Sequence, residues 1–306
     1  MTRGGADLHP GLAYLCLGSS MFVVGAYVAL SKPLAVIFPV FLLGCLRFGI
    51  GGLAVLHWLR KPTTEAPLTP RVRWLVFLES FIGSFLFTVF MVLGVSYSSA
   101  VAAGIIMSAI PAAIAVLSRL VLREAIRPQV LAAIACAVCG IALLALTRPA
   151  DEGLAPESAT RWLGYGLLGG AVLCEAAYAV IGKQLTGTLS AKRISALMNV
   201  WGFALMLPAG AYAAWHFDFA AVTGPTWGLL LFYGLAASGT IWLWMTGLRR
   251  VPASRAGVFT VLLPVGAACV GVLALGESFS RLHALAFAAA LLGLMLAVWP
   301  GRAPRA

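Results

Sequence analysis

The 306-residue chain is 61% hydrophobic and only 10% charged, and its mean hydropathy is +0.98. A soluble domain carries about 25% charged residues, so this composition excludes a soluble globular protein and places the chain in a lipid bilayer. The net charge of +11 comes from basic residues in short loops between apolar stretches, where Lys and Arg fix membrane topology. We therefore expect the basic residues to orient the chain in the bilayer, and we expect no binding of nucleic acid.

Apolar stretches recur from one end of the sequence to the other. Each has about 20 residues, enough for a helix to cross about 30 Å of hydrocarbon with its backbone polar groups satisfied internally. The first stretch is longer than the core of a signal peptide and no soluble region follows it, so we expect it to be retained as a helix. In chain order the sequence predicts ten transmembrane helices, at residues 11–31, 35–59, 72–94, 98–121, 129–147, 162–184, 190–215, 226–248, 252–275 and 281–299.

The longest polar connection lies at the midpoint of the chain, at residues 147–161, and contains the helix breakers Pro149 and Pro156. It divides the predicted helices into two sets of five. We therefore predict four regions: a first five-helix repeat at 1–147, an external linker at 148–161, a second five-helix repeat at 162–299 and a cytoplasmic tail at 300–306.

The second half of the chain repeats the first. Near the start of each half, AYVALSKPL at residues 26–34 matches AYAVIGKQL at residues 177–185, and the match pairs Tyr27 with Tyr178. Farther on, a shift of 153 residues holds without a gap over 67 residues. Chance does not maintain such a register, so we interpret the halves as duplicates of one unit. The shift superposes Trp74 on Trp227, Gly104 on Gly257, Pro111 on Pro264 and Glu124 on Glu277.

Charge predicts that the two repeats cross the membrane in opposite directions. Five is an odd number, so a second repeat joined by one short linker enters the membrane upside down relative to the first. The loop after the second helix carries four basic residues between positions 60 and 73, whereas its counterpart at 213–226 carries none. Placing both termini in the cytoplasm puts sixteen of the 21 Lys and Arg residues inside, so the positive-inside rule predicts cytoplasmic termini.

The end of each repeat carries a shared motif. Small residues are followed by G-x6-P and by an acidic residue thirteen positions after the proline, in AAGIIMSAIPAAIAVLSRLVLRE at 102–124 and SRAGVFTVLLPVGAACVGVLALGE at 254–277. This pattern resembles the EamA repeat of the drug/metabolite transporter (DMT) superfamily. The resemblance covers essentially the whole chain, through the duplicated five-helix unit and the length as well as the motif.

The resemblance implies an all-α membrane protein with two inverted five-helix repeats around a central cavity. It implies a multi-pass exporter in the bacterial cytoplasmic (inner) membrane that moves a small-molecule substrate by alternating access, as inverted repeats allow. The subtype we prefer is an amino-acid exporter similar to YddG, for neutral or aromatic amino acids. A drug or other metabolite exporter of the same fold and a channel are left open, as is a homo-oligomer.

Three ionisable residues lie within the predicted spans, namely Arg47, Glu79 and Glu175. Such groups cost about 2.5 to 3.5 kcal/mol on insertion, so each is a candidate functional residue. Arg47 and Glu79 lie on consecutive helices and differ in depth by about 7.5 Å at 1.5 Å per residue. Two interpretations stay open for them: an internal ion pair that fixes helix packing, or a substrate-binding site that faces the cavity.

Glu175 is the strongest candidate for a substrate-binding residue. It lies near the middle of the sixth span, with Tyr178 about one turn later on the same helical face. A buried glutamate can attract an ammonium group or carry a proton for ion coupling. A protonated carboxyl group that is hydrogen-bonded to a neighbouring helix is the structural alternative. For Glu124 and Glu277, at helix ends beside loops, we expect capping.

Pro111 and Pro264 occupy equivalent positions in otherwise uninterrupted spans. Each removes one backbone donor and loosens the preceding turn, which suits a hinge, although a simple tolerated kink is the alternative. Met107, Ser108 and Phe259 flank these prolines and would line the cavity if the breaks face it.

Aromatic residues deep in the spans are further candidates for contact with an apolar substrate group. We include Trp242 in the eighth span and Phe22 in the first, with packing or lipid contact as the alternative. Most other tryptophans lie near span ends, where interfacial belts form.

An intramembrane enzyme is the alternative from another class, and the sequence offers little for it. No span pairs His or Asp residues at the spacing of metal ligands, so we predict no catalytic residue, no metal site and no cofactor. The C-x-x-C of Cys136 and Cys139 lies inside a span, where packing is the simpler explanation. A GxxxxGK[ST] motif is absent, so transport would be facilitated or coupled to an ion gradient.

Overall fold

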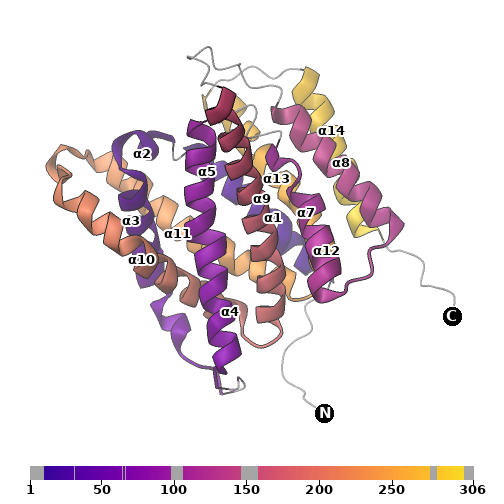
Figure 1. Ribbon diagram of the computed structural model, residues 1–306, viewed down its shortest axis with the longest axis horizontal. Coiled ribbons are helices and arrows are strands. Elements are labelled where there is room, and N and C mark those ends of the chain that lie inside the picture. The colour runs from indigo at the N-terminus through magenta and orange to yellow at the C-terminus, as the bar shows by residue number, and fades with distance from the viewer. Residues whose placement is uncertain are drawn as a thin grey trace.

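The computed structural model describes residues 10–30, 32–63, 65, 67–97, 106–145, 158–275 and 281–299, and every regular element within these ranges is helical (Figure 1). The elements of the first repeat are α1 (Pro10–Leu30), α2 (Lys32–Ile37), α3 (Val40–Val55), η1 (Leu56–Leu59), α4 (Pro70–Ser80), η2 (Phe81–Leu86), α5 (Phe87–Ser96), α7 (Ile110–Leu117), η3 (Ser118–Leu122) and α8 (Pro128–Ala145). Those of the second repeat are α9 (Ser158–Thr186), α10 (Ala191–Trp215), η4 (Phe219–Ala221), α11 (Gly224–Leu248), α12 (Ala253–Ala256), η5 (Gly257–Val261), α13 (Leu262–Leu275) and α14 (Arg281–Val298).

The helices match the predicted spans in number and order. Within the described residues, six helices are long and apolar enough to cross a bilayer, and four shorter apolar helical stretches accompany them. The prediction of an all-α membrane protein of ten helices in two five-helix repeats is therefore confirmed.

Four predicted spans contain interruptions that their apolar composition hides; the one at 98–121 has a turn at residues 108–109. The span predicted at 35–59 breaks before α3 at Pro39, which has an extended backbone and cannot donate a backbone hydrogen bond. The span at 72–94 contains the π-helical segment η2, and the span at 252–275 contains the 3₁₀ segment η5. The first part of the span at 98–121 lies outside the described residues.

Helix starts follow local capping rules. Thr69 precedes α4 and its Oγ1 accepts a hydrogen bond from the Val72 amide at 3.3 Å, with Pro70 at the first helical position. Ser190 precedes α10 and its Oγ accepts from the Arg193 amide at 3.4 Å. A side-chain oxygen at this position accepts a hydrogen bond from an amide that the helix itself leaves unpaired. Thr69 and Ser190 therefore define where α4 and α10 begin.

The packing partners of the helices exchange between the repeats. The first helix, α1, packs against α11 and α13, and its counterpart α9 packs against α4–η2–α5 and α7. The remaining helices pair with their own counterparts, α3 with α10 and α8 with α14. Figure 1 shows these two pairs on opposite sides of the bundle with α1 and α9 between them. A pseudo-twofold relation between the repeats accounts for this exchange, and inverted-repeat transporters have such a relation about an axis in the membrane plane.

Glycines bring α1 and α13 into backbone contact. A Cβ atom at Gly25 would collide with the carbonyl oxygen of Leu263, and one at Gly266 would collide with that of Phe22. Small residues allow such close approach between membrane helices, where dispersion replaces the hydrophobic effect as the packing force.

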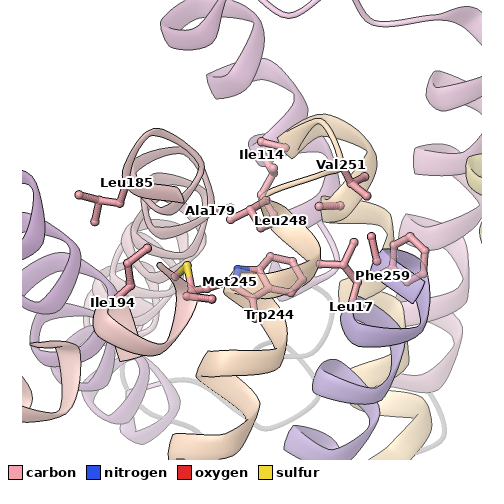
Figure 2. Packing of buried hydrophobic residues seen from close by; sticks show 14 of the residues in the cluster. Leu17, Ile114, Ala179, Leu185, Ile194, Trp244, Met245, Leu248, Val251 and Phe259 are labelled. Atoms are coloured by element: carbon pink, nitrogen blue, oxygen red, sulfur yellow. The ribbon is translucent and has the colours of Figure 1, made fainter. Parts of the chain in front are cut away.

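The largest apolar cluster closes one end of the bundle. We call this the basic end, because the start of α4 and the turn after α11 contribute Arg71, Arg73, Arg249 and Arg250 there. Side chains from α1, α7, α9, α10, α11, α12 and η5 meet in the cluster, and Trp244 is only 1% exposed. In Figure 2, Leu17 and Phe259 lie on one side of Trp244, and Ile194 and Met245 lie on the other.

Candidate functional site

Four helices converge on Arg47. The Arg47 guanidinium carbon from α3 lies 4.6 Å from the ring centroid of Phe48 and 5.5 Å from that of Tyr233 on α11. Tyr27 on α1 packs edge-to-face against Tyr233, with 5.2 Å between ring centroids. Arg47 also interacts electrostatically with Tyr27 and with Tyr178 on α9. We refer to Tyr27, Arg47, Tyr178 and Tyr233 as the Arg47–tyrosine cluster.

Two carboxyl groups border this cluster. Glu79 on α4 and Glu175 on α9 interact electrostatically with each other, and both interact with Tyr178. Glu175 also interacts with Tyr27. The structure therefore brings together Arg47, Glu79, Glu175 and Tyr178, four of the candidates from the sequence.

The two carboxyl groups differ in exposure. Glu79 is 0% exposed, whereas Glu175 keeps some accessible surface. Arg47 and Tyr178 are likewise partly exposed although they lie deep within the bundle. Glu175, Arg47 and Tyr178 therefore keep surface that another molecule can contact, whereas Glu79 does not.

Two glycines let α4–η2 and α9 interlock at this point. A Cβ at Gly83 would lie 2.6 Å from Cδ2 of Tyr178, and a Cβ at Gly182 would lie 2.8 Å from Oε1 of Glu79. Gly83 belongs to the π-helical segment η2, a type of distortion that is frequent at functional sites. The Glu79 and Tyr178 side chains therefore fill spaces that larger residues on the facing helix would occupy.

The ion pair between Arg47 and Glu79 is not formed, so this interpretation of the two residues is wrong. Both carboxylate oxygens of Glu79, and Nε of Arg47, are buried and find no hydrogen-bond partner among the described residues. The two side chains point toward different neighbours. Arg47 lies over the rings of Phe48 and Tyr233, while Glu79 faces Gly182 on α9.

Two of the aromatic candidates lie outside the Arg47–tyrosine cluster. Trp242 packs against Trp58, with ring centroids 5.9 Å apart. Phe259 is buried and stacks on Tyr14 at 5.8 Å in the apolar cluster of the basic end. Their contacts are those of packing residues.

The aromatic candidate Phe22 and the proline-flanking candidates Met107 and Ser108 lie at a helix contact and near a turn. Phe22 is 39% exposed and its backbone touches the α13 helix at Gly266. Met107 is half-buried and Ser108 is buried, in the turn that precedes α7.

Both candidate hinge prolines stand in the first turn of a helix. Pro111 is the second residue of α7, and Pro264 is the third residue of α13, directly after η5. The first turn leaves its amides unpaired in any case, so proline costs no hydrogen bond there. The breaks themselves precede the prolines, at residues 108–109 and in η5, so the prediction of uninterrupted spans around these residues is wrong.

Sequence reasoning missed Tyr233 and did not connect Tyr27 with Arg47. The internal repeat contained a usable signal for Tyr27, because it pairs this residue with Tyr178, and both tyrosines interact with Arg47. Tyr233 is one of many aromatic residues in an apolar span, and its sequence context does not distinguish it.

Polar contacts reinforce the closure of the basic end. Lys183 Nζ donates to the carbonyl oxygens of Leu248 and Val251, at 2.7 Å each. The Glu124 carboxylate accepts from the amides of Ala253 and Ser254, at 2.8 and 3.0 Å, and from the Ser254 hydroxyl at 2.8 Å. We call this the Lys183–Glu124 clasp, since the two side chains hold the α11–α12 connection from both sides.

The clasp joins the two repeats and explains one expected role. Glu124 at the end of the first repeat caps α12 at the start of the motif in the second, so it has a structural role as expected, but at a helix of the other repeat and not at the helix end beside it. Its counterpart Glu277 lies outside the described residues.

An ion pair makes a second connection between the repeats at this end. Arg193 on α10 donates to Glu65 Oε2 at 2.7 Å, and the Ser190 amide donates to Oε1 at 2.7 Å. Burial alone raises the pKa of the Glu65 carboxyl, but the hydrogen bonds from Arg193 and Ser190 outweigh burial and hold that pKa below its ordinary value. Glu65 is therefore bound in its ionised form.

Groups of three or more His, Cys, Asp or Glu side chains placed to hold a metal ion do not occur in the part of the chain that the structure describes. The chemistry available at the candidate site is therefore that of a guanidinium, two carboxyl groups and phenol hydroxyls. Such groups bind and orient polar molecules and hold protons.

Comparison with known proteins gives a consistent result. The EamA-like transporter family matches this chain twice, at residues 11–146 and 162–299. The uncharacterized transporter YetK of Bacillus subtilis (strain 168) is 32% identical over 296 residues, which cover 96% of this chain and 89% of YetK. The uncharacterized transporter YyaM of the same organism is 23% identical over 301 residues, covering 97% and 96%. A solved crystal structure has the same fold, with a TM-score of 0.75 and 20% identity over 93% of this chain and 96% of its own.

Proposed function

The chain belongs to the EamA-like transporter family, and from this membership we propose that it is a secondary transporter that exports a small zwitterionic metabolite, a neutral or aromatic amino acid in the simplest case. The family assignment makes it a multi-pass membrane transporter. The substrate class is our proposal, and it rests on the chemistry of the Arg47–tyrosine cluster and Glu175.

Arg47 is the observation that carries the proposal. It is a deeply placed guanidinium with no carboxylate in ion-pair distance among the described side chains, and its Nε is unpartnered. A guanidinium in a site of low dielectric binds a carboxylate strongly and in a defined orientation, through two parallel hydrogen bonds. An unpaired buried arginine is otherwise costly to keep, so a carboxylate-bearing substrate supplies a reason for its presence.

Glu175 supplies the complementary charge. It is partly exposed and interacts with Tyr27 and Tyr178 of the cluster. A substrate whose carboxylate binds Arg47 can direct its ammonium group toward Glu175 across the tyrosine rings. The rings would contact an apolar side chain on their faces and offer hydroxyls at their edges.

The position of the cluster suits alternating access. Its members come from α1, α3, α9 and α11, and thus from both repeats, and inverted-repeat transporters bind their substrates between the repeats near the bilayer midplane. The positive-inside rule assigns the basic end to the cytoplasm. The apolar cluster and the Lys183–Glu124 clasp then correspond to a conformation closed toward the cytoplasm.

Uptake into proteoliposomes with a panel of labelled L- and D-amino acids tests the proposal. We expect saturable, stereoselective transport, which a channel would not show. Arg47→Gln removes the fork that binds the carboxylate, worth about 1.5 to 3 kcal/mol, and should lower transport efficiency about tenfold to a hundredfold. Arg47→Lys, which keeps only the charge, should fall between. Glu175→Gln should weaken amino-acid transport more than transport of analogues without the ammonium group.

Arg73→Gln provides the matched control, because Arg73 is an exposed arginine on α4 at the basic end. It should transport like the unmodified chain. Wild-type rates in Arg47→Gln for every transported substrate, or selective transport of molecules that lack a carboxylate, would contradict the proposed substrate class.

A further inference from the structure

The Glu79 carboxyl group is completely buried, so no group of a substrate can contact it in this conformation. Its side chain is 0% exposed, and neither carboxylate oxygen has a hydrogen-bond partner among the described residues. Oε1 lies against Gly182, and the Met245 side chain fills the same space, with Cε 3.0 Å and Sδ 3.2 Å from the position that a Cβ of Gly182 would take. The groups in contact with this oxygen are therefore a glycine and the end of a methionine side chain, and neither can donate a hydrogen bond to it.

The cations on the neighbouring helices are all engaged elsewhere or distant. On α9, Lys183 donates to carbonyl oxygens of the α11–α12 connection. On α10, Arg193 binds Glu65, and Lys192 lies over the Trp58 ring. On α3, Arg47 lies over Phe48 and Tyr233.

The other charged or titratable groups near Glu79 do not favour a negative charge there. On its own helix Arg71 and Arg73 are exposed at the basic end, and across the contact Glu175 and Tyr178 face it from α9. A carboxylate without a cation or donor, next to a second carboxyl group, is too costly to bury in its charged form. The neutral acid satisfies the same geometry at far lower cost.

We propose that Glu79 is a proton-binding site, distinct from the substrate site, that couples export to a pH gradient. It holds its proton in the conformation closed at the basic end and releases it when α4 and α9 separate. The coupling rests on the proposed function, since it requires a transported substrate. The bound proton itself does not.

One proton then moves inward for each exporting cycle. Water on the outer side supplies the proton, and the Glu79 O–H bond forms before the site is sealed. When the basic end opens, that O–H bond breaks, the proton passes to cytoplasmic water, and the hydrated carboxylate remains. A substrate ammonium near Glu175 favours this ionised form of Glu79, because the two carboxyl groups interact, and by linkage proton release favours binding of the substrate.

Infrared spectroscopy of the purified protein tests for the proton without any substrate. A protonated carboxylic acid has a carbonyl stretch separate from the bands of carboxylates and amides. In the Glu175→Gln background at neutral pH we expect this band to be present, and we expect Glu79→Gln in the same background to remove it. Absence of the band from Glu175→Gln, or its persistence after Glu79→Gln, would overturn the proton site.

Proton flux in proteoliposomes tests the coupling. With a pH-sensitive dye inside the vesicles and the amino-acid panel as the probe, the unmodified chain and the Arg73→Gln control should show substrate-dependent proton movement and a transport rate that responds to the pH gradient. In Glu79→Gln that response should disappear. Transport by the unmodified chain with no proton movement would overturn the coupling while the proposed function stands.

The two assays separate the possible failures. If the infrared band behaves as expected but no amino acid is transported, the proposed function fails and the proton site stands. If Glu79→Gln does not fold, as judged by gel filtration and thermal unfolding, the Glu175→Gln spectrum alone decides, because a persistent band there still requires a protonated acid other than Glu175. Glu79→Asp, which keeps the acid, should then retain the band in that background.

Discussion

Glu65 shows how a single carboxylate can connect two repeats outside the membrane-spanning segments. It binds the Arg193 guanidinium and the Ser190 amide at 2.7 Å each. These contacts need the charged form, and they hold the pKa of Glu65 below its ordinary value. The contribution of Glu65 to stability is therefore fully present above the ordinary glutamate pKa and is lost as the pH falls through the lower pKa of the folded protein.

We accordingly expect Glu65→Gln to lower the unfolding temperature in detergent at neutral pH, and the difference from the unmodified chain to shrink below about pH 4. Thermal unfolding of both proteins across this range gives the measurement. The Glu65→Gln/Arg193→Gln double variant is the control, since removing both partners isolates the pair. A difference that stays constant from neutral to acidic pH would show that the charge of Glu65 is not what stabilises this contact.

The candidate site could be predicted from the sequence only in part, and the reason is visible in individual residues. The high cost of an ion in hydrocarbon identifies Arg47, Glu79 and Glu175 wherever they point. The directions of their side chains depend on which helices pack together, so the absence of an Arg47–Glu79 pair and the presence of Tyr233 beside Arg47 could not be predicted. Phe259 and Trp242 failed to join the cluster for the same reason.

At the scale of helices and loops, the Lys183–Glu124 clasp is the contact most open to experiment. Hydrogen bonds to a charged group contribute about 1.5 to 3 kcal/mol. Glu124→Gln replaces one of the accepting oxygens by an amide donor that faces the backbone amides of α12, so we expect it to destabilise the closed basic end by about this amount. With the native cysteines replaced, a cysteine placed at Ala253, whose side chain is buried, should then react faster with a thiol reagent in membranes.

Lys61→Gln is the control for this prediction, since Lys61 is an exposed cation at the basic end. It should leave both the reactivity of the introduced cysteine and the unfolding temperature unchanged. Equal reactivity in the Glu124→Gln and Lys61→Gln proteins would mean that the clasp does not keep this end closed.

Helix number and order could be predicted because apolar length is a strong signal, whereas interruptions within apolar stretches could not. A break such as η5 or the turn before α7 leaves the hydropathy unchanged. Pro111 and Pro264 indicate only that a helix does not continue normally through them. A proline in the first turn of a new helix and a proline at a mid-helix kink have the same sequence context.

For the whole molecule, labelling of single cysteines introduced into loops measures the orientation in the membrane. Lys61 lies in the loop between η1 and α4, and Asp218 lies between α10 and α11 in the equivalent connection of the second repeat. Because the repeats are inverted, we expect a cysteine at 61 to react with a membrane-impermeant reagent only after the cells are permeabilised, and a cysteine at 218 to react in intact cells.

A chain with all six native cysteines replaced serves as the background for this measurement and should show no labelling. Reaction of positions 61 and 218 from the same side would contradict the inverted arrangement. Reaction of 61 alone in intact cells would contradict the assignment of the basic end to the cytoplasm.

The helix arrangement is repeated in the two halves, but the two acidic residues within the predicted spans, Glu79 and Glu175, each occur in one half only. Glu79 corresponds to Phe232 under the shift of 153, and Glu175 corresponds to Val24 under the shift of 151. The repeat therefore accounts for the helix packing and for the Tyr27–Tyr178 pair, whereas Glu79 and Glu175 have no acidic counterpart in the other half. Family membership predicts the helix packing well and these two acidic residues poorly.

The π-helical segment η2 determines where Glu79 points. A π turn accommodates one residue more than an α turn, and one residue corresponds to about 100° of rotation about the axis. The α4, η2 and α5 segments form one continuous helix, and η2 rotates the α4 side chains about the helix axis relative to those of α5. The counterpart in the second repeat, α11, is a regular α-helix throughout. We expect deletion of one residue between Phe81 and Leu86 to restore regular winding and to turn the Glu79 carboxyl group about a quarter of a revolution away from Gly182, so the winding of η2 sets the direction of this acid.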